Sequence, residues 1–139
     1  MLMDIEEIVE NFEYLDDWED RYRYIIDLGR GLPLMDKSDK NDGTKVQGCM
    51  SQVWMVSRVH HESAPPTITF LADSDAHIVK GLIAILLAIY SGKTPRQIVE
   101  FDIEDAFRRL GLDQHLSPNR RNGFYAMVER IREAAAVNA

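Results

Sequence analysis

The segment from Ile78 to Tyr90 constrains the fold of this chain more than any other. Wound as a helix, it carries apolar side chains on almost every side, and the uncharged run from Gly81 to Gly92 overlaps it. A surface helix shows an apolar stripe on one face only, so this helix must be buried. At 12 residues the uncharged run is too short to span a bilayer, which takes ~20 apolar residues. The other segments are therefore expected to pack around a central helix.

Two amphipathic helices are predicted before this central one. Apolar residues follow the i, i+3, i+4, i+7 spacing of one helical face at Ile5, Ile8, Val9 and Phe12. The same spacing recurs from Trp18 to Gly29, and Asp17 before it is a natural N-cap. The glycines and proline between residues 29 and 33 are expected to end this second helix.

The periodicity then changes from that of a helix to that of a strand. The run from Ser51 to Val59 has a strand-like pattern, and in the run from Thr67 to Ala72 every second residue is apolar, with a polar connection between the two runs. Alternation of this kind is typical of two antiparallel strands joined by a loop. A short third strand is predicted near Thr44–Gln47, which gives a small sheet of about three strands.

Helices are predicted for the remainder of the chain. The Asp73–Asp75 segment is expected to cap the central helix, and Thr94 to Gln97 has the pattern of a capping box with proline at its first helical position. A short helix follows from Asp102 to Gly111, and Ser117 with Pro118 opens the last one. Helices, then a small sheet, then helices indicate an α+β fold, and residues 1–139 are expected to form a single domain.

Charge and cysteine content argue against several kinds of partner and site. With 23 acidic and 16 basic side chains the net charge is −7, which argues against nucleic acid and anionic membranes as partners. The N-terminal residues are acidic and lack the basic region of a secretory signal, so a cytoplasmic location is expected. The single cysteine forms no intramolecular disulfide and is expected to be a free thiol in a reducing compartment.

That one cysteine, Cys49, follows Gly48 where a polar loop gives way to the first predicted strand. Glycine permits a tight turn with positive φ and leaves room for another molecule to approach the sulfur. A cysteine that is accessible and near a cation is reactive as its thiolate, whereas a buried cysteine behaves as a small hydrophobe. The residues around Cys49 leave both interpretations open.

Three kinds of chemistry are available to a reactive thiol at this position. A metal or iron–sulfur site needs several converging thiolates or imidazoles, and this chain has one cysteine. A cysteine hydrolase needs a histidine base, for which His77 or His115 is available but tied to the thiol by no motif. A thiol that receives and hands on sulfur needs only one cysteine, an exposed loop and a docking face.

The segment from Val46 to Trp54, VQGCMSQVW, resembles the signature of the SufE family of sulfur acceptor proteins. Three further segments resemble that family in the same order: YIIDLG with the following Leu-Pro, DSDAHIVKGLIA, and HLSPNR. Together they extend over nearly the whole chain. The resemblance implies an α+β fold in which a small antiparallel sheet packs against several helices, as in the scaffold proteins of the IscU type.

The resemblance also implies a function. A pyridoxal-phosphate cysteine desulfurase, of the SufS or CsdA type, holds sulfur as a persulfide, and the acceptor takes this sulfur onto its own cysteine. The acceptor thereby stimulates the desulfurase and passes the sulfur to an iron–sulfur cluster scaffold. It is a sulfur-relay protein rather than an independent enzyme and has no cofactor of its own, since the pyridoxal phosphate belongs to the partner. An iron–sulfur scaffold, or a cysteine hydrolase, is the alternative.

By this resemblance Cys49 is the residue that accepts sulfur. Gly48, Ser51 and Gln52 are expected to shape its loop. We further hypothesise that the loop rests against an apolar hollow, formed by the central helix and the strand faces, and turns outward when a partner docks.

Three charged residues complete the predicted site. The resemblance places Asp73 and Asp75 beside the cysteine loop, where they are expected to serve the docking surface in addition to capping. Arg120 stands in the first turn of the last helix, where a cation is mildly unfavourable for the helix dipole. The resemblance places Arg120 near the cysteine, where it would favour the thiolate or contact the partner.

Overall fold

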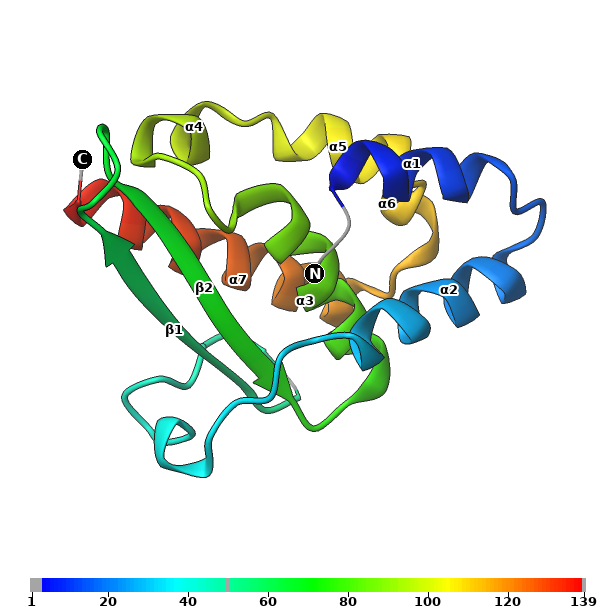
Figure 1. The fold of residues 1–139 in the computed structure, drawn as a ribbon. Helices are drawn as coiled ribbons and strands as arrows, with labels where there is room; N and C mark the ends of the chain where they lie inside the picture. Colours follow the sequence, from blue (N-terminus) through cyan, green and yellow to red (C-terminus); the bar gives the residue numbers. More distant parts are fainter. Residues whose placement is uncertain (1–3, 50, 139) are drawn as a thin grey trace.

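The computed structural model describes residues 4–49 and 51–138, in which seven helices pack against one two-stranded sheet (Figure 1). The elements in chain order are α1 (Ile5–Glu13), α2 (Trp18–Arg30), the short 3-10 helix η1 (Lys37–Asp39), β1 (Val53–His60), β2 (Thr67–Ser74), α3 (His77–Tyr90), α4 (Pro95–Glu100), α5 (Ile103–Arg109), α6 (Leu112–His115) and α7 (Pro118–Val137). The α+β prediction is therefore confirmed. Among the described residues, no helix is both long enough and apolar enough to cross a membrane.

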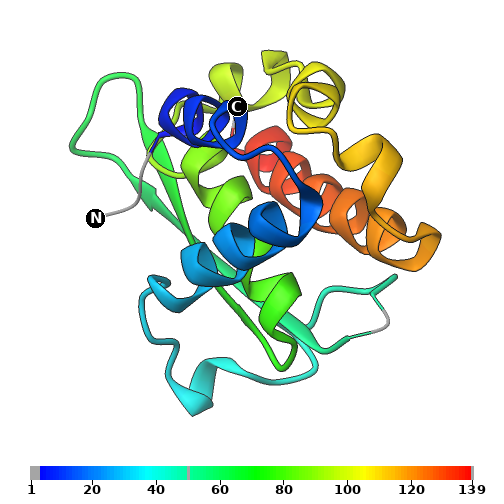
Figure 2. The same ribbon diagram turned by 90° about the vertical axis from the view of Figure 1, so that its right-hand side faces the viewer.

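Helix α3 is the centre of the molecule, as its apolar sequence predicted. It contacts α1, α2, β2 and α7, and Figure 2 shows it between the sheet and α7. Its residues from Gly81 to Leu87 are all buried, as is Tyr90 at its end. Every face of α3 therefore contacts another element, which is why this helix lacks a polar side.

Two glycines let α2 and α3 approach until their backbones touch. A Cβ added to Gly81 would lie 2.1 Å from the carbonyl oxygen of Ile25, and one added to Gly29 would lie 2.6 Å from the amide nitrogen of Gly81. Neither position has room for a side chain. Gly29 was expected to help end α2, but the helix continues to Arg30 because Gly29 is a packing contact in its last turn.

The sheet is a single antiparallel hairpin. Strands β1 and β2 pair from Val53 opposite Ser74 to His60 opposite Thr67. The alternation predicted for β2 is confirmed, since Ile68, Phe70 and Ala72 are buried and their neighbours are only partly so.

The third strand predicted near Thr44–Gln47 is wrong as a strand. The segment makes one isolated bridge, between Lys45 and Trp54, with hydrogen bonds from the Met55 amide to the Thr44 carbonyl (2.9 Å) and from the Val46 amide to the Val53 carbonyl (2.8 Å). The ladder ends there because the chain turns away at Gly48, whose φ is +89°.

Most of the predicted helix caps are confirmed. Thr94 and Gln97 form the reciprocal capping box, and the side chains of Asp102 and Ser117 accept amide hydrogens at the starts of α5 and α7. The short α6, which follows Gly111 in the left-handed conformation, was not predicted.

The cap predicted for α3 is wrong. Asp73 belongs to β2, and the N-cap of α3 is Ala76, which has no side-chain cap bond. The nearest equivalent is the Ser74 hydroxyl, which accepts a hydrogen bond from the Ala76 amide. The two aspartates are used elsewhere, as described below.

Candidate functional site

Cys49 lies on a tight turn that rests on helix α7. A Cβ added to the preceding Gly48 would stand 3.3 Å from the Cβ of Ala126, and the positive φ of Gly48 also favours glycine. The Cys49 thiol is half-buried and donates a hydrogen bond to the carbonyl oxygen of Gly123, with a sulfur-to-oxygen distance of 3.6 Å. Figure 2 shows the segment before β1 lying beneath the first turns of α7.

A hollow of about 420 Å³ opens beside the thiol. Its apolar walls come from three elements, namely β1, α3 and α7, and consist of Val53, Val79, Leu82, Phe124 and Met127. Its remaining lining is Cys49, Ser51, Ser117, Asn119, Arg120 and Gly123. Arg120 is the only charged side chain in this described lining. The hollow therefore offers the sulfur an apolar wall on one side and a cationic rim on another.

The resting position keeps the thiol protonated. Burial raises the pKa of Cys49 above its ordinary value, because the thiolate is more costly than the thiol in a half-buried, apolar setting. Access to water or to a reagent would remove this cause. In this resting position, burial therefore lowers the fraction of Cys49 that is ionised.

Hydrogen bonds hold the chain on both sides of the Cys49 turn. Before it, the Val46 amide donates to the Val53 carbonyl. After it, the Gln52 amide donates to the Asp75 carboxylate (3.1 Å) and the Asp75 amide donates to the Gln52 carbonyl (3.3 Å). Asp75 thus holds the end of the loop instead of capping α3.

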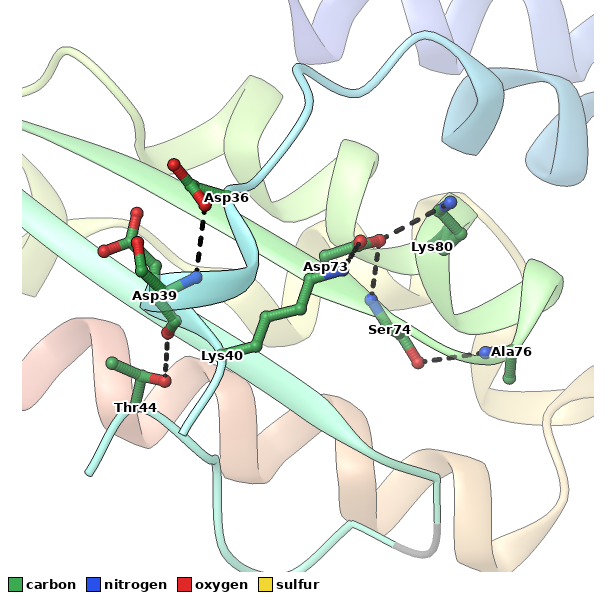
Figure 3. Close-up of polar contacts among 9 residues, drawn as sticks. Asp36, Asp39, Lys40, Thr44, Asp73, Ser74, Ala76 and Lys80 are labelled. Carbon is green, nitrogen blue, oxygen red and sulfur yellow. Dashed lines mark hydrogen bonds and ion pairs between the residues drawn. The ribbon is translucent and has the colours of Figure 1, made fainter. Parts of the chain in front are cut away.

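Asp73 stands at a separate ionic cluster outside the hollow (Figure 3). Its carboxylate oxygens lie 2.7 Å from the Lys40 ammonium and 3.5 Å from the Lys80 ammonium. Lys40 also lies over the ring of Trp54, 5.3 Å from its centroid. Through Lys40, Asp73 fastens the connection that leads to Cys49 onto the end of the sheet.

The cluster determines how Asp73 titrates. Burial opposes the ionised form of Asp73. Hydrogen bonds from Lys40 and from the Ser74 amide favour that form, as do the charges of Lys80 and Lys40. These contributions outweigh burial, so the pKa of Asp73 lies below its ordinary value. A depressed pKa means that ionised Asp73 stabilises the fold above the unfolded value of about 4, and that this stabilisation is lost as pH falls through the folded value.

We therefore expect Asp73→Asn to lower the free energy of unfolding by about 2 kcal/mol at pH 7, the range of hydrogen bonds to charged groups. The deficit relative to wild type should shrink as the pH falls below about 4. Urea unfolding at pH 7 and at pH 3 measures both. Asp27→Asn is the matched control, because Asp27 pairs with Arg30 (3.0 Å) in an exposed setting and should cost less than about 1 kcal/mol. Equal losses in the two variants at pH 7 would contradict this account.

The structure brings some of the predicted residues together and separates others. Cys49, Ser51 and Arg120 share the hollow, and Gly48 and Gln52 flank them in the same turn. Asp75 reaches the loop through Gln52, whereas Asp73 acts on the preceding connection.

Sequence reasoning placed Arg120 of α7 near the cysteine but did not predict the surface of α7 on which the cysteine turn rests. Gly123 and Ala126 are one helical turn apart and form the surface on which the Cys49 turn rests. A glycine inside a helix costs about 1 kcal/mol relative to alanine, so Gly123 was a signal that its position needs close approach.

Comparison with known proteins shows the family to which the chain belongs. Residues 6–135 match the family model of SufE, described as an Fe-S metabolism associated domain. An uncharacterized SufE-like protein of Rhizobium meliloti is 47% identical over 131 residues, which is 94% of either chain. Another from Rhizobium etli is 47% identical over 135 residues, covering 97% of this chain and 91% of its own.

A solved structure shares the fold at much lower identity. The solution structure of a hypothetical protein from Thermus thermophilus superposes with a TM-score of 0.76 at 18% identity, over 99% of this chain and 98% of that one. At that identity the likeness concerns the fold alone. The family match spans nearly the whole chain, including the cysteine turn, the sheet, the central helix and most of α7. This chain therefore belongs to the SufE family of proteins associated with iron–sulfur metabolism.

Proposed function

We propose that this protein is a sulfur acceptor that takes persulfide sulfur onto Cys49 from a pyridoxal-phosphate cysteine desulfurase and passes it on for iron–sulfur cluster assembly. The observation that carries this proposal is a lone thiol on a short turn, fastened on both sides and set beside an apolar hollow. Membership of the SufE family supports the same role.

The proposed step is an exchange between two cysteines. The Cys49 thiolate attacks the outer sulfur of the desulfurase persulfide, a new sulfur–sulfur bond forms at Cys49, and the old bond breaks with its electron pair leaving on the desulfurase cysteine. The number of sulfur–sulfur bonds is unchanged, so no oxidant or reductant is needed. The desulfurase recovers its free thiolate, which is why removal of the sulfur would stimulate it.

The resting geometry is suited to storage rather than to attack. A half-buried thiol with a raised pKa holds little thiolate at neutral pH, and it is also protected from oxidation. We therefore infer that docking of the desulfurase draws the turn away from α7 before transfer. The hollow of about 420 Å³ is large compared with one added sulfur atom, whose bond to Sγ is about 2 Å long, so it has room for the outer sulfur.

Arg120 and Ser51 are placed to help once the thiol is exposed. Both line the hollow beside Cys49, and Arg120 is an exposed cation at the start of the 20-residue helix α7. A cation near a thiol favours its thiolate. We propose that Arg120 supplies this charge at the moment of transfer, and that Ser51 contributes a hydroxyl at the same rim.

The experiment is intact mass spectrometry after incubation with a cysteine desulfurase and cysteine in the absence of reductant. We expect the protein to gain the mass of one sulfur atom and to lose it on addition of a thiol reductant. Protein alkylated at Cys49 beforehand should gain none, and omission of cysteine should give none. If the desulfurase turns over cysteine while the unblocked protein gains no sulfur with any desulfurase tested, the acceptor role is rejected.

A further inference from the structure

We propose that Gly123 is a positioning residue for the Cys49 turn. Its backbone carbonyl and the surface of α7 around it, which we call the seat, hold the turn while Sγ of Cys49 carries a hydrogen. The turn is released when that hydrogen is lost. The seat distinguishes the thiol from the thiolate by the number of hydrogens on Sγ. It also distinguishes Cys49 with a free thiol (the empty carrier) from Cys49 as a persulfide (the loaded carrier), because Sγ of the persulfide carries no hydrogen. This second distinction rests on the proposed function.

The contact between the turn and α7 is made at the level of the backbone. The Cys49 sulfur lies 3.6 Å from the Gly123 carbonyl oxygen, to which it donates. A Cβ on Gly123 would stand 3.6 Å from that sulfur and 3.9 Å from both Cα and Cβ of Cys49. Any side chain larger than alanine would therefore occupy the space in which the thiol now rests.

A second small residue completes the seat. Ala126 lies one helical turn beyond Gly123, and its Cβ would stand 3.3 Å from a Cβ on Gly48. Residues three apart on a helix share a face, so Gly123 and Ala126 present one flat surface to the Gly48–Cys49 turn. This surface fits closely against the turn, and its Gly123 carbonyl accepts the hydrogen bond of the thiol.

That polar group accepts hydrogen bonds and cannot donate them. A thiol offers one hydrogen to it, whereas a thiolate offers none and presents negative charge to an oxygen that is itself partly negative. Loss of the proton to water therefore converts an attractive contact into a repulsive one. Of the described residues that line the hollow from β1, α3 and α7, only Arg120 has a charged or titratable side chain.

Loading has the same effect on the contact. In a persulfide the former hydrogen position on Sγ is taken by the outer sulfur, so Sγ has nothing to donate to Gly123. The loaded turn thus loses the bond that holds the empty one. By this reasoning the empty carrier is the form most firmly seated on α7.

The test compares Gly123→Leu and Gly123→Ala by the pH profile of Cys49 alkylation with iodoacetamide. Leucine fills the seat, so we expect the apparent pKa of Cys49 to fall toward the free value of about 8.5 and the rate at pH 7 to rise about tenfold. Alanine makes only ordinary contact with the sulfur and should stay within about twofold of wild type. Ala136→Leu, at an exposed position of α7, controls for a bulky residue in the same helix.

An unchanged profile in Gly123→Leu, or an equal change in Ala136→Leu, would overturn the proposal.

A second measurement uses the wild-type chain alone. Treatment with methyl methanethiosulfonate replaces the thiol hydrogen by S–CH₃, and hydrogen exchange of residues 45–49 should then become at least about fivefold faster. Unchanged exchange would also overturn the seat. Neither experiment contains a desulfurase, so failure of sulfur transfer and failure of the seat are distinguishable.

Discussion

Cys49→Ser is expected to return a cysteine desulfurase from its stimulated rate to the rate that it has alone. The serine hydroxyl is close to the thiol in size, so the turn should keep its place on α7. A hydroxyl that has no adjacent base is a weak nucleophile, since it is un-ionised at neutral pH, and it accepts no sulfur. Sulfide production from cysteine, followed over a range of acceptor concentrations, measures the effect.

The control for this variant is its affinity for the desulfurase. Docking depends on the surface around the turn, so binding measured by calorimetry should change by less than about threefold, or roughly 0.7 kcal/mol. If Cys49→Ser binds normally and still stimulates the desulfurase, stimulation arises from a change in the enzyme's conformation. The interpretation of Cys49 as the sulfur acceptor would then lose its main support.

Gly81→Ala is expected to cause the largest loss of stability among the glycine-to-alanine substitutions, since its added Cβ would make the shortest contact. The new Cβ would stand 2.1 Å from the Ile25 carbonyl oxygen and 2.4 Å from its Cγ2, so α2 and α3 must separate to admit it. Overpacking against backbone cannot be relieved by a side-chain rotation, and we expect a cost of about 3 kcal/mol or more. Urea unfolding monitored by circular dichroism measures this cost.

Gly31→Ala provides the comparison for Gly81→Ala. Gly31 is exposed at the end of α2, has a φ of −87°, and would place a Cβ 3.4 Å from the Leu28 carbonyl, an ordinary contact. We expect its effect to stay within about 0.5 kcal/mol. A Gly81→Ala protein as stable as Gly31→Ala would show that the two helices can part freely, contrary to the packing described above.

The parts of the fold that were predictable depend on local chemistry. The side-chain spacing of α1 and α3, the alternation in β2 and the capping box at Thr94 each follow from residues near one another in sequence. Such patterns show which face of an element is buried and which backbone amides are capped by side chains. Both are determined by residues that lie close together in sequence.

The errors arose where distant segments compete for the same group. Asp73 and Asp75 resemble caps in sequence, but Lys40 and Gln52, more than twenty residues earlier, occupy them instead. The third strand ended at one bridge because the Gly48 turn had to reach α7, which lies more than seventy residues further along the chain.

The candidate site divides in the same way. Cys49 was selected as the candidate thiol because its segment resembles the SufE signature, whereas its neighbouring residues alone also allowed a buried, inert cysteine. The hollow needs β1, α3 and α7 in their final places, and so the sequence did not show that Phe124 and Met127 would line it. The sequence thus indicated a candidate thiol, and tertiary packing determined its surroundings.

The two fastenings of the cysteine turn determine how far its sulfur can travel. Val46 and Gln52 are held to Val53 and Asp75, and Cys49 lies three residues from each of them. A fully extended chain advances about 3.4 Å per residue, so the tether has a radius of roughly 10 Å. If the persulfide of a desulfurase lies deeper than this below the enzyme's surface, the Cys49 turn alone does not reach it. Other parts of this protein must then also enter the enzyme's active-site cleft. Tether length thus sets a limit on partner choice that is independent of any attraction between the two surfaces.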